Sequence, residues 1–448
     1  MNVTIRDWTF THFWVRPVVK VWFDFYHKSV SYSGTGHIDW DKPIIFAASH
    51  QSAFTDALCL ILPTRYVNDR FIYPLVRADA FGNNRLVDWV LTSFHMMPVY
   101  RPKDKVDIKK RNETVFRDCY SILSKNRNLL IHPEGNCFPI KKVRRFKKGL
   151  ARIAFGAEMI NDFELDTEII PVGINYRKST KPRSGIHVRF GKPVSLKQYE
   201  KAYREHEAAA IADLTAEIEQ RVKDLTVDIQ LDDSYRLIEE LLQLSKQMIP
   251  SFVGSEEYSV GELRFEKKIV SRSESVLGGD KRKAGRLERC IEQLRTLLKK
   301  QELDENHSLQ GSYSLFQLAV KGSGFIIMLP FFLFGWINNL LPWYLIHHLA
   351  GRIQDTQFIN SARMAMGLLA FPLFYVIQTL FMWIISGSLL WTTIYFISLP
   401  ISGVMSLKLS EKWKEWRQQF KLRFMSAENS NRLAEVRDEL FNILEIEV

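Results

Sequence analysis

A histidine and an aspartate six positions apart follow the first apolar run of this 448-residue chain. The run PIIFAA occupies residues 43–48, and His50 and Asp56 come soon after it. A neutral histidine beside a carboxylate can act as a general base, because the carboxylate fixes the ring tautomer and stabilises the imidazolium that forms on proton abstraction. The chain has 11 histidines, so one such spacing arises easily by chance. The pair is a hypothesis whose weight depends on the rest of the sequence.

A general base needs a nucleophile to activate, and the sequence offers no obvious one of its own. There is no GxSxG sequence, and the cysteines show neither CxxC spacing nor a partner pattern. They are Cys59, Cys119, Cys137 and Cys290. The nucleophile is therefore expected to be a hydroxyl group of a substrate. The same cysteine spacing argues against a zinc site or a disulfide framework and favours a reducing compartment. No metal or redox cofactor is implied.

Basic residues and a carboxylate follow two later apolar runs. Arg101 and Lys103 come directly after residues 95–100 and suit a phosphate ligand. Glu134 and Gly135 come after the run NLLIH. There the carboxylate can accept a hydrogen bond from a polyol hydroxyl, and the glycine lets the backbone approach a substrate.

A dense basic run follows within a few residues. Residues 141–148 read KKVRRFKK, lead into a helical pattern and include Arg145 and Lys148. Cations at a helix N-terminus form a good anion site. Taken singly, each of these features is at least as well explained by a surface charge, a simple turn or a solvated face. Their ordered combination makes a catalytic site the better interpretation.

The elements that must position these residues alternate between strands and helices. Short apolar runs predict strands, and stripes at helical spacing predict helices between them. The expected strands are residues 43–48, 71–76, 95–100, 128–132, 168–176 and 186–191, with helical stripes at residues 115–123 and 150–157. This alternation predicts an α/β domain with a mostly parallel central sheet flanked by helices. Functional side chains gather at the carboxyl ends of such strands, which is where His50, Arg101 and Glu134 stand.

The ordered set of motifs resembles the glycerophospholipid acyltransferase superfamily. His50 and Asp56 are similar to the His/Asp motif of that family. The segments VYR, PEG and IIPVGI are similar to its second, third and fourth motifs, and FGKPVSL is similar to its domain-closing strand. The resemblance covers roughly residues 40–195.

The resemblance implies both a fold and an activity. An acyltransferase domain is expected at residues 37–196, with His50 as the general base on an acceptor hydroxyl, Arg101 as a phosphate ligand and Glu134 in acceptor binding. The donor would be an acyl-CoA or acyl-carrier-protein thioester. The expected reaction is acyl transfer to glycerol 3-phosphate. A lysophosphatidate or phospholipid-remodelling acyltransferase is the alternative, and a lipid-binding membrane scaffold with a decayed acyltransferase domain is the non-enzymatic one.

Two departures from the family pattern bear on the site. Five residues, QSAFT, separate His50 from Asp56, whereas four is the most common number. One extra residue would rotate Asp56 by about 100° within a regular helix, but a turn can absorb it. Some fungal-type glycerol-3-phosphate/dihydroxyacetone-phosphate acyltransferases share the longer spacing, and the organisation of the chain is similar to theirs. The segment EGNCF also replaces the common EGTRS, which leaves phosphate binding to Arg101 and to the basic run at residues 141–148.

Segments on both sides of this domain point to a membrane. Residues 1–36 combine aromatic and basic side chains at helical spacing, which indicates an interfacial helix, with a core-packing helix as the alternative. A membrane region is expected at residues 322–407, where residues 366–385 and 389–407 are uncharged and long enough to cross a bilayer. Residues 325–349 are apolar but interrupted by proline and polar residues, so a re-entrant or interfacial segment is preferred there to a full span.

The remaining segments are expected to be helical. Residues 197–310 form a helical insert with a basic, glycine-containing loop at residues 271–286, and residues 408–448 form an amphipathic tail. Lysine and arginine at both ends of the membrane hairpin place the catalytic domain and the tail on the cytoplasmic side. The net charge of +11 suits phosphate substrates and membrane lipids as partners. A nucleic-acid partner is disfavoured, since the basic residues cluster at the expected phosphate site and at the membrane ends.

Overall fold

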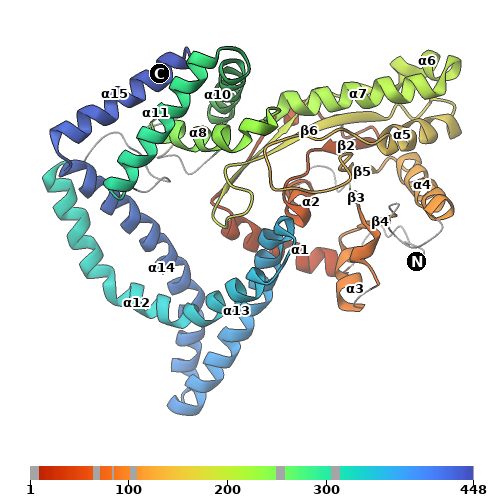
Figure 1. Cartoon of the computed structure of the whole chain (residues 1–448). Coiled ribbons are helices and arrows are strands. Elements are labelled where there is room, and N and C mark those ends of the chain that lie inside the picture. The colour runs from red at the N-terminus through yellow and green to blue at the C-terminus, as the bar shows by residue number, and fades with distance from the viewer. Residues whose placement is uncertain are drawn as a thin grey trace. The chain divides into compact units, whose positions relative to one another are not determined.

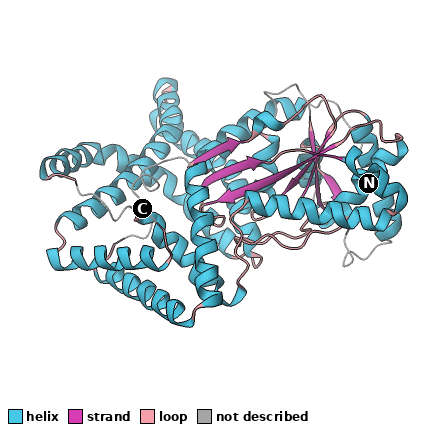
Figure 2. Cartoon of the chain, turned by 90° about the horizontal axis from the view of Figure 1, so that it is seen from above, coloured by secondary structure: helices cyan, strands magenta, loops and turns pink. Residues whose placement is uncertain are grey.

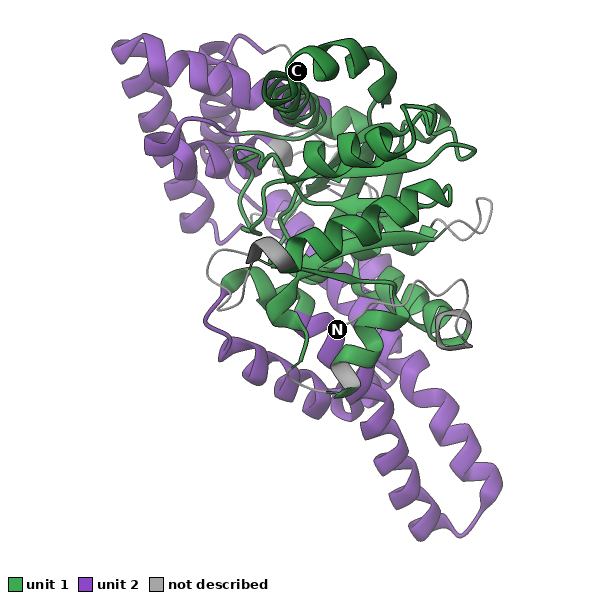
Figure 3. Cartoon of the chain, turned by 90° about the vertical axis from the view of Figure 1, so that its right-hand side faces the viewer, with its two compact units in different colours: residues 1–228, 257–263, 356–361 green, residues 229–256, 264–355, 362–448 purple. Residues whose placement is uncertain are grey.

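The computed structural model, drawn in Figure 1, describes residues 10–63, 71–82, 85–100, 108–248, 258–303 and 313–446. The chain divides into two compact units, coloured separately in Figure 3. Unit 1 consists of residues 1–228, 257–263 and 356–361, and unit 2 consists of residues 229–256, 264–355 and 362–448. Unit 1 contains the sheet, whereas the described part of unit 2 is helical. The expected α/β fold and the long helical C-terminal region are confirmed.

Unit 1 is built around one sheet. Its strands are β1 (Ser29–Ser33), β2 (Ile44–Ala48), β3 (Ile72–Arg77), β4 (Met97–Val99), β5 (Asn128–Ile131), β6 (Glu168–Tyr176), β7 (Gly185–Phe190) and β8 (Val194–Ser195). The spatial order is β1-β7-β6-β2-β5-β3-β4, with β8 paired to β6. The apolar runs predict six of these strands correctly. They miss β1, which is largely polar, and β8, which has only 2 residues.

The strands nearest the centre of the sheet run in the same direction. β2 pairs in parallel with β5 and β6, and β3 pairs in parallel with β4 and β5. β7 runs antiparallel to β6, and β1 joins β7 in parallel. Figure 2 shows helices on both sides of the strands. Because the carboxyl ends of β2, β3, β5 and β6 meet at one edge of the sheet, the segments that follow them come together there.

Helices bury the faces of this sheet. They are α2 (Ala53–Ile61), α3 (Arg85–Ser93), α4 (Ile108–Ser124), α5 (Gly149–Ile160), α6 (Glu200–Glu205) and α7 (Glu207–Leu225). Ile45 and Ala47 of β2 share one core cluster with apolar residues of α4, α5 and α7. The cluster includes Leu214 and Ile218 of α7, both at 0% exposure. The expected start of a separate helical insert at residue 197 is therefore wrong, since unit 1 continues to residue 228.

The first helix, α1 (Phe10–Tyr26), precedes β1 and has two different sides. On one side Phe23 is buried, and the guanidinium of Arg16 donates to two carbonyl oxygens at the end of α2, at 2.7 and 2.9 Å. The other side exposes large apolar side chains: Trp14, Val18 and Val21. The prediction of a core-packing helix is therefore correct for the side of α1 that contains Arg16 and Phe23. Contact of the other side with a membrane stays a prediction.

Unit 2 includes paired helices where a loop is expected. α8 (Tyr235–Gln247), α10 (Val260–Gly279), α11 (Lys281–Lys300) and α15 (Ala427–Ile443) are its shorter helices, with the first turn of α10 counted in unit 1. The predicted loop at residues 271–286 is wrong, because Gly279 ends α10 and Asp280 caps α11 at once through the backbone N–H groups of Arg282 and Lys283. α11 packs along α15, where Cys290 Sγ donates to the Val436 carbonyl at 3.2 Å.

Three long helices of the described chain carry the apolar C-terminal region. They are α12 (Leu315–Gly351), α13 (Thr356–Ser386) and α14 (Leu389–Arg423). Each is long and apolar enough to cross a membrane. The predicted spans at residues 366–385 and 389–407 fall within α13 and α14, while α12 is continuous through Pro330 and Pro342. Length and composition therefore allow α12 to cross as well, and the re-entrant or interfacial assignment stays a prediction.

Candidate active site

His50 lies in the turn between β2 and α2, at the carboxyl edge of the sheet. Its Nδ1 is 2.8 Å from Oδ2 of Asp56, which sits in the first turn of α2. The same oxygen accepts the backbone N–H groups of Gln51 and Ser52, each at 2.8 Å. Ala53 has a φ of +28°, so the chain bends sharply where the helix begins. The turn absorbs the extra residue between His50 and Asp56, which is why the longer spacing still brings the two side chains together.

Asp56 is fully buried, and a tyrosine holds its second oxygen. The hydroxyl of Tyr176, the last residue of β6, donates to Oδ1 of Asp56 at 2.5 Å. Burial acts to raise the pKa of Asp56, but the hydrogen bond and charge of His50, helped by His132 and Tyr176, outweigh it and lower the pKa. Asp56 is therefore a carboxylate that can orient the imidazole ring. Tyr176 is not among the residues predicted from the sequence, although its place at the end of a predicted strand is a usable signal.

His132, the residue after β5, stacks on His50. The two ring centroids are 4.0 Å apart, and the ring planes differ by 13°. Nδ1 of His132 lies 3.1 Å from the carbonyl oxygen of Ala48, and because a carbonyl only accepts, Nδ1 carries the proton. Burial, together with the charge of His50, lowers the pKa of His132 to about 3. His132 is thus a neutral ring packed against the candidate base.

Glu134 contacts the backbone of the turn that contains His50. Its Oε1 accepts the backbone N–H of His50 at 2.8 Å, and its Oε2 accepts Nε of Arg144 at 3.0 Å. Burial raises the pKa of Glu134, while the charge of Arg144 and the bond from His50 oppose that rise. Both carboxylate oxygens already accept hydrogen bonds, so Glu134 fixes the position of His50. Its predicted contact with an acceptor hydroxyl stays a prediction.

Gly135 has a left-handed backbone conformation that favours glycine. Its φ is +73°, and a Cβ atom there would lie 2.6 Å from Nζ of Lys147. The backbone N–H of Lys147 also donates to the Pro133 carbonyl at 2.9 Å. The glycine therefore leaves room for a lysine side chain beside the turn that follows β5.

These residues border a cavity of about 620 Å³ within unit 1. His50 and His132 both lie in its wall. Apolar side chains form much of the remaining lining, among them Phe54, Leu75, Val99, Phe116, Ile131 and Ile153. Three cations of the described chain also line it: Arg77, Lys147 and Arg152. A base beside a mostly apolar cavity with several cations suits a substrate that has both an apolar part and an anionic group.

The segment that contains this geometry matches a protein family. Residues 29–175 match the family model described as Acyltransferase. These residues are an acyltransferase domain. The domain runs from β1 into β6 and includes His50, Asp56 and Glu134. The resemblance to the glycerophospholipid acyltransferase superfamily is thereby confirmed.

Comparison with solved structures adds a structural likeness. A crystal structure of the 1-acyl-sn-glycerophosphate (LPA) acyltransferase PlsC from Thermotoga maritima is 18% identical in sequence, with a TM-score of 0.31. The similarity covers 47% of this chain and 82% of that chain. No match was found among the curated proteins.

The acyltransferase domain presents only some of the predicted phosphate ligands to the cavity. Arg145 and Lys148 do not belong to the cavity lining that the described residues form, and their role as ligands stays a prediction. Lys147, between them, lines the cavity instead. Arg101 and Lys103 lie outside the described residues, and their role stays a prediction.

Arg77 is a cation of the cavity that the sequence predictions lack. It is the last residue of β3 and therefore stands at the same carboxyl edge as His50. Its guanidinium pairs with Asp79 and lies in the cavity lining. The signal in the sequence is the arginine that ends the apolar run IYPLVR.

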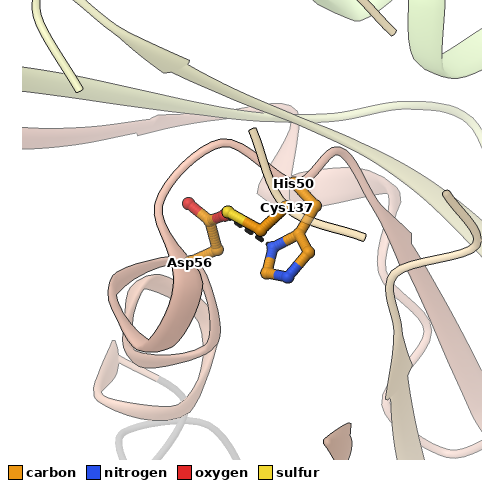
Figure 4. A group of neighbouring side chains, drawn as sticks. All are labelled: His50, Asp56 and Cys137. Atoms are coloured by element: carbon orange, nitrogen blue, oxygen red, sulfur yellow. Dashed lines mark hydrogen bonds and ion pairs between the residues drawn. The ribbon is translucent and has the colours of Figure 1, made fainter. Parts of the chain in front are cut away.

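Cys137 brings a third potential metal-ligand atom next to the pair in the acyltransferase domain, as Figure 4 shows. The ligand atoms of His50, Asp56 and Cys137 lie within 4.8 Å of one another, and all four cysteines are free. Burial raises the pKa of Cys137, which disfavours the thiolate that metals bind. The Asp56 carboxylate already accepts bonds from two side chains and two backbone N–H groups. This donor set fits a hydrogen-bonded His–Asp pair better than a metal centre.

Proposed function

We propose that this protein is a membrane-bound O-acyltransferase of phospholipid synthesis, which moves a fatty acyl group from an acyl thioester to a hydroxyl of glycerol 3-phosphate. The observation that carries the proposal is the 2.8 Å contact between His50 and Asp56 in the wall of a mostly apolar cavity. The acyltransferase domain supports acyl transfer as the reaction class. The long apolar helices support a membrane location.

The reaction follows from the orientation of the His50 ring. Nδ1 faces Asp56, so Nε2 is the nitrogen left to accept a proton (Figure 4). Nε2 takes the proton of the acceptor hydroxyl while the hydroxyl oxygen forms a bond to the thioester carbonyl carbon. The C–S bond then breaks, the ester is released, and the departing thiolate takes the proton from the imidazolium. His50 returns to its neutral form, and the buried Asp56 carboxylate stabilises the imidazolium between the two steps.

The cations of the cavity are suited to the acceptor phosphate. Arg77 ends β3 and Lys147 follows β5, at the same edge of the sheet as His50. A phosphate held by such cations places the glycerol hydroxyls near the base, and orientation of this kind lowers the barrier to transfer.

The test is thiol release by the purified full-length protein in detergent micelles. Acyl-CoA and acyl-carrier-protein thioesters are each supplied with and without glycerol 3-phosphate. His50→Ala is expected to lower the acceptor-dependent rate by about 10²–10⁴-fold, the usual contribution of a general base. His206→Ala, a change at an exposed histidine, should keep the rate of the parent.

Two outcomes would contradict the proposal. If His50→Ala stays within about threefold of the parent, His50 is not the general base. If the parent releases no thiol with either donor and any acceptor, the lipid-binding scaffold with a decayed domain becomes the better interpretation.

Lysophosphatidate is the competing acceptor, because the same base and phosphate site would serve both reactions. The longer His/Asp spacing, and a membrane hairpin behind further helices, favour glycerol 3-phosphate by their similarity to fungal-type enzymes. A competition assay with both acceptors at equal concentration and one labelled thioester distinguishes the two reactions. Monoacylglycerol phosphate is expected to appear first and to dominate early. A diacyl product formed at about tenfold higher efficiency would assign the lipid acceptor instead.

A further inference from the structure

The first residues of α13 belong to unit 1, far beyond the end of the acyltransferase match at residue 175. Ser361 contacts the turn that carries the catalytic pair. Its hydroxyl donates to the Ser52 carbonyl at 3.3 Å and lies 3.1 Å from Oγ1 of Thr55. Thr55 directly precedes Asp56, and both it and Ser361 are buried. The start of α13 is thus packed against the backbone that positions Asp56.

A second contact, made by α1, holds the start of α13 in place. The hydroxyl of Tyr26, the last residue of α1, donates to Oδ1 of Asn360 at 2.7 Å. Asn360 and Tyr26 are both buried, at 2% and 8% exposure, so this bond is shielded from water. Residues 360 and 361 are therefore held on two sides by unit 1 itself.

The segment also contributes a side chain to the cavity. Phe358 lines the same cavity as His50. The guanidinium carbon of Arg77 lies 5.5 Å from the centre of the Phe358 ring, within reach of a cation–π contact. The apolar residues around it, such as Leu75 and Phe54, come from the acyltransferase domain. Phe358 is the part of this wall that the acyltransferase match does not include.

We propose that residues 356–361 complete the active site, with Phe358 as the residue that determines which acyl chain length the cavity accepts. The inference rests on the proposed function: the cations of the cavity bind the acceptor phosphate, and its apolar side chains contact the acyl chain of the thioester. A rigid aromatic ring in the wall of a mostly apolar cavity limits how much chain can enter beside it, since unfilled space and overpacking both cost binding energy. Ser361 acts as a positioning residue that fixes this wall to the catalytic turn.

The test of Phe358 is a chain-length profile of kcat/KM with saturated acyl thioesters of increasing length. Phe358→Ala should raise the ratio of long-chain to short-chain kcat/KM by about tenfold, and Phe358→Trp should lower it. Phe358→Leu, a milder change, should move the ratio in the direction of Phe358→Ala. Phe381→Ala is the matched control, because Phe381 lies on the same helix but is 62% exposed and does not line the cavity.

Two negative results have different meanings. If the parent transfers acyl groups and none of the Phe358 variants changes the profile, Phe358 does not set chain length, and the proposed function stands. If the parent transfers no acyl group from any thioester, the proposed function fails and this inference fails with it.

The role of Ser361 is tested by a double-mutant cycle with Thr55. Ser361→Ala and Thr55→Val should each lower kcat by about three- to tenfold and leave the KM of both substrates unchanged. The double variant should be no slower than the worse single variant, because both changes remove the same contact. Thr55→Ser keeps the hydroxyl and should keep the parent's kcat. Additive losses, or a rise in KM, would overturn the positioning role.

Discussion

The ring of His132 lies flat on the ring of His50, with centroids 4.0 Å apart. Burial keeps His132 neutral by lowering its pKa to about 3. The general base therefore gains its proton against an uncharged aromatic face, which attracts a cation and does not repel it. The stack also limits rotation of the His50 ring away from Asp56.

Replacement of His132 should show separately how its aromatic ring and a charge at this position affect catalysis by His50. His132→Phe keeps the stacked ring, so kcat is expected to stay within about threefold of the parent. His132→Lys puts a cation beside the imidazolium that forms during transfer, and kcat should fall by at least about tenfold. Steady-state kinetics across pH would measure both. Equal rates for the lysine variant and the parent would show that charge at this position does not act on His50.

The hydroxyl of Tyr176 should act on catalysis through Asp56. Tyr176→Phe removes one charge-assisted hydrogen bond to the carboxylate, so kcat is expected to fall by about three- to tenfold with KM unchanged. Asp56→Asn should fall further than this, but less than His50→Ala. Tyr32→Phe is the matched control, because the Tyr32 hydroxyl donates at 3.1 Å to the Cys59 carbonyl, on the same helix as Asp56. Parent-like activity of Asp56→Asn would mean that the pair does not work together.

Two adjacent lysines should differ in their effect on the acceptor. Both side chains are exposed, but only Lys147 belongs to the cavity lining. Lys147→Ala is expected to raise the KM for glycerol 3-phosphate by about tenfold or more, the effect of losing a charge-assisted pair, and to leave the KM for the thioester unchanged. Lys148→Ala should change neither constant. Initial rates with each substrate varied in turn would decide between them, and a reversed order would move the phosphate site out of the cavity.

Two histidines with a lowered pKa, the buried His27 and the partly buried His132, should make the protein sensitive to mild acid. Burial lowers the pKa of His27, like that of His132, to about 3. Each histidine binds a proton in the unfolded chain below about pH 6.5 but stays neutral in the folded chain, so folding loses up to about 1.4 kcal/mol per pH unit for each. The loss begins below the unfolded pKa and continues down to the folded pKa. The lowered pKa of Asp56 acts in the same direction only at lower pH, below about 3.9.

The melting temperature of the detergent-solubilised protein should therefore fall between about pH 7 and about pH 5. His27→Gln and His132→Gln together should flatten this dependence, even where they lower the melting temperature at neutral pH. A slope unchanged by the double variant would assign the acid sensitivity to other groups.

Contacts within each unit bear on how often the chain crosses a membrane. Residues 257–263, before α12, and residues 356–361, after it, both belong to unit 1. Glu262 pairs with Arg177 at 2.6 Å, while Ser361 contacts Thr55 at 3.1 Å. A folded α/β unit lies on one side of a bilayer, so a single crossing by α12 is disfavoured. The packing of α11 on α15 also requires an even number of crossings between them.

The expected topology is therefore two crossings, by α13 and α14. Cysteine probes at Ser271, Asp355 and Glu428 should all label from the cytoplasmic side, where the basic C-terminal half of α14 is also expected to lie. A probe at Gly387, which ends α13 in a left-handed conformation, should label only from the other side. Opposite labelling of Ser271 and Glu428 would mean that α12 crosses too.

Local patterns in the sequence determined much of the fold. Apolar runs located six strands within two residues of their observed ends, because a strand buried on both faces must be apolar throughout. The placement of His50 and Glu134 after such runs also predicted that they meet, since carboxyl ends of parallel strands share an edge. Composition was a weaker guide at residues 271–286, where two glycines end one helix and an aspartate starts the next.

Tertiary structure alone decided which distant residues complete the site. Tyr176 reaches Asp56, His132 reaches His50, and Phe358 reaches the cavity, each from a different element. Sequence periodicity does not predict such contacts. The choice of Lys147 over Lys148 likewise depends on the folded chain, because both precede α5 and only Lys147 belongs to the cavity lining. The spacing of residues in the sequence shows which groups are available for chemistry. Only the packing of the folded chain determines which of these groups face the same cavity.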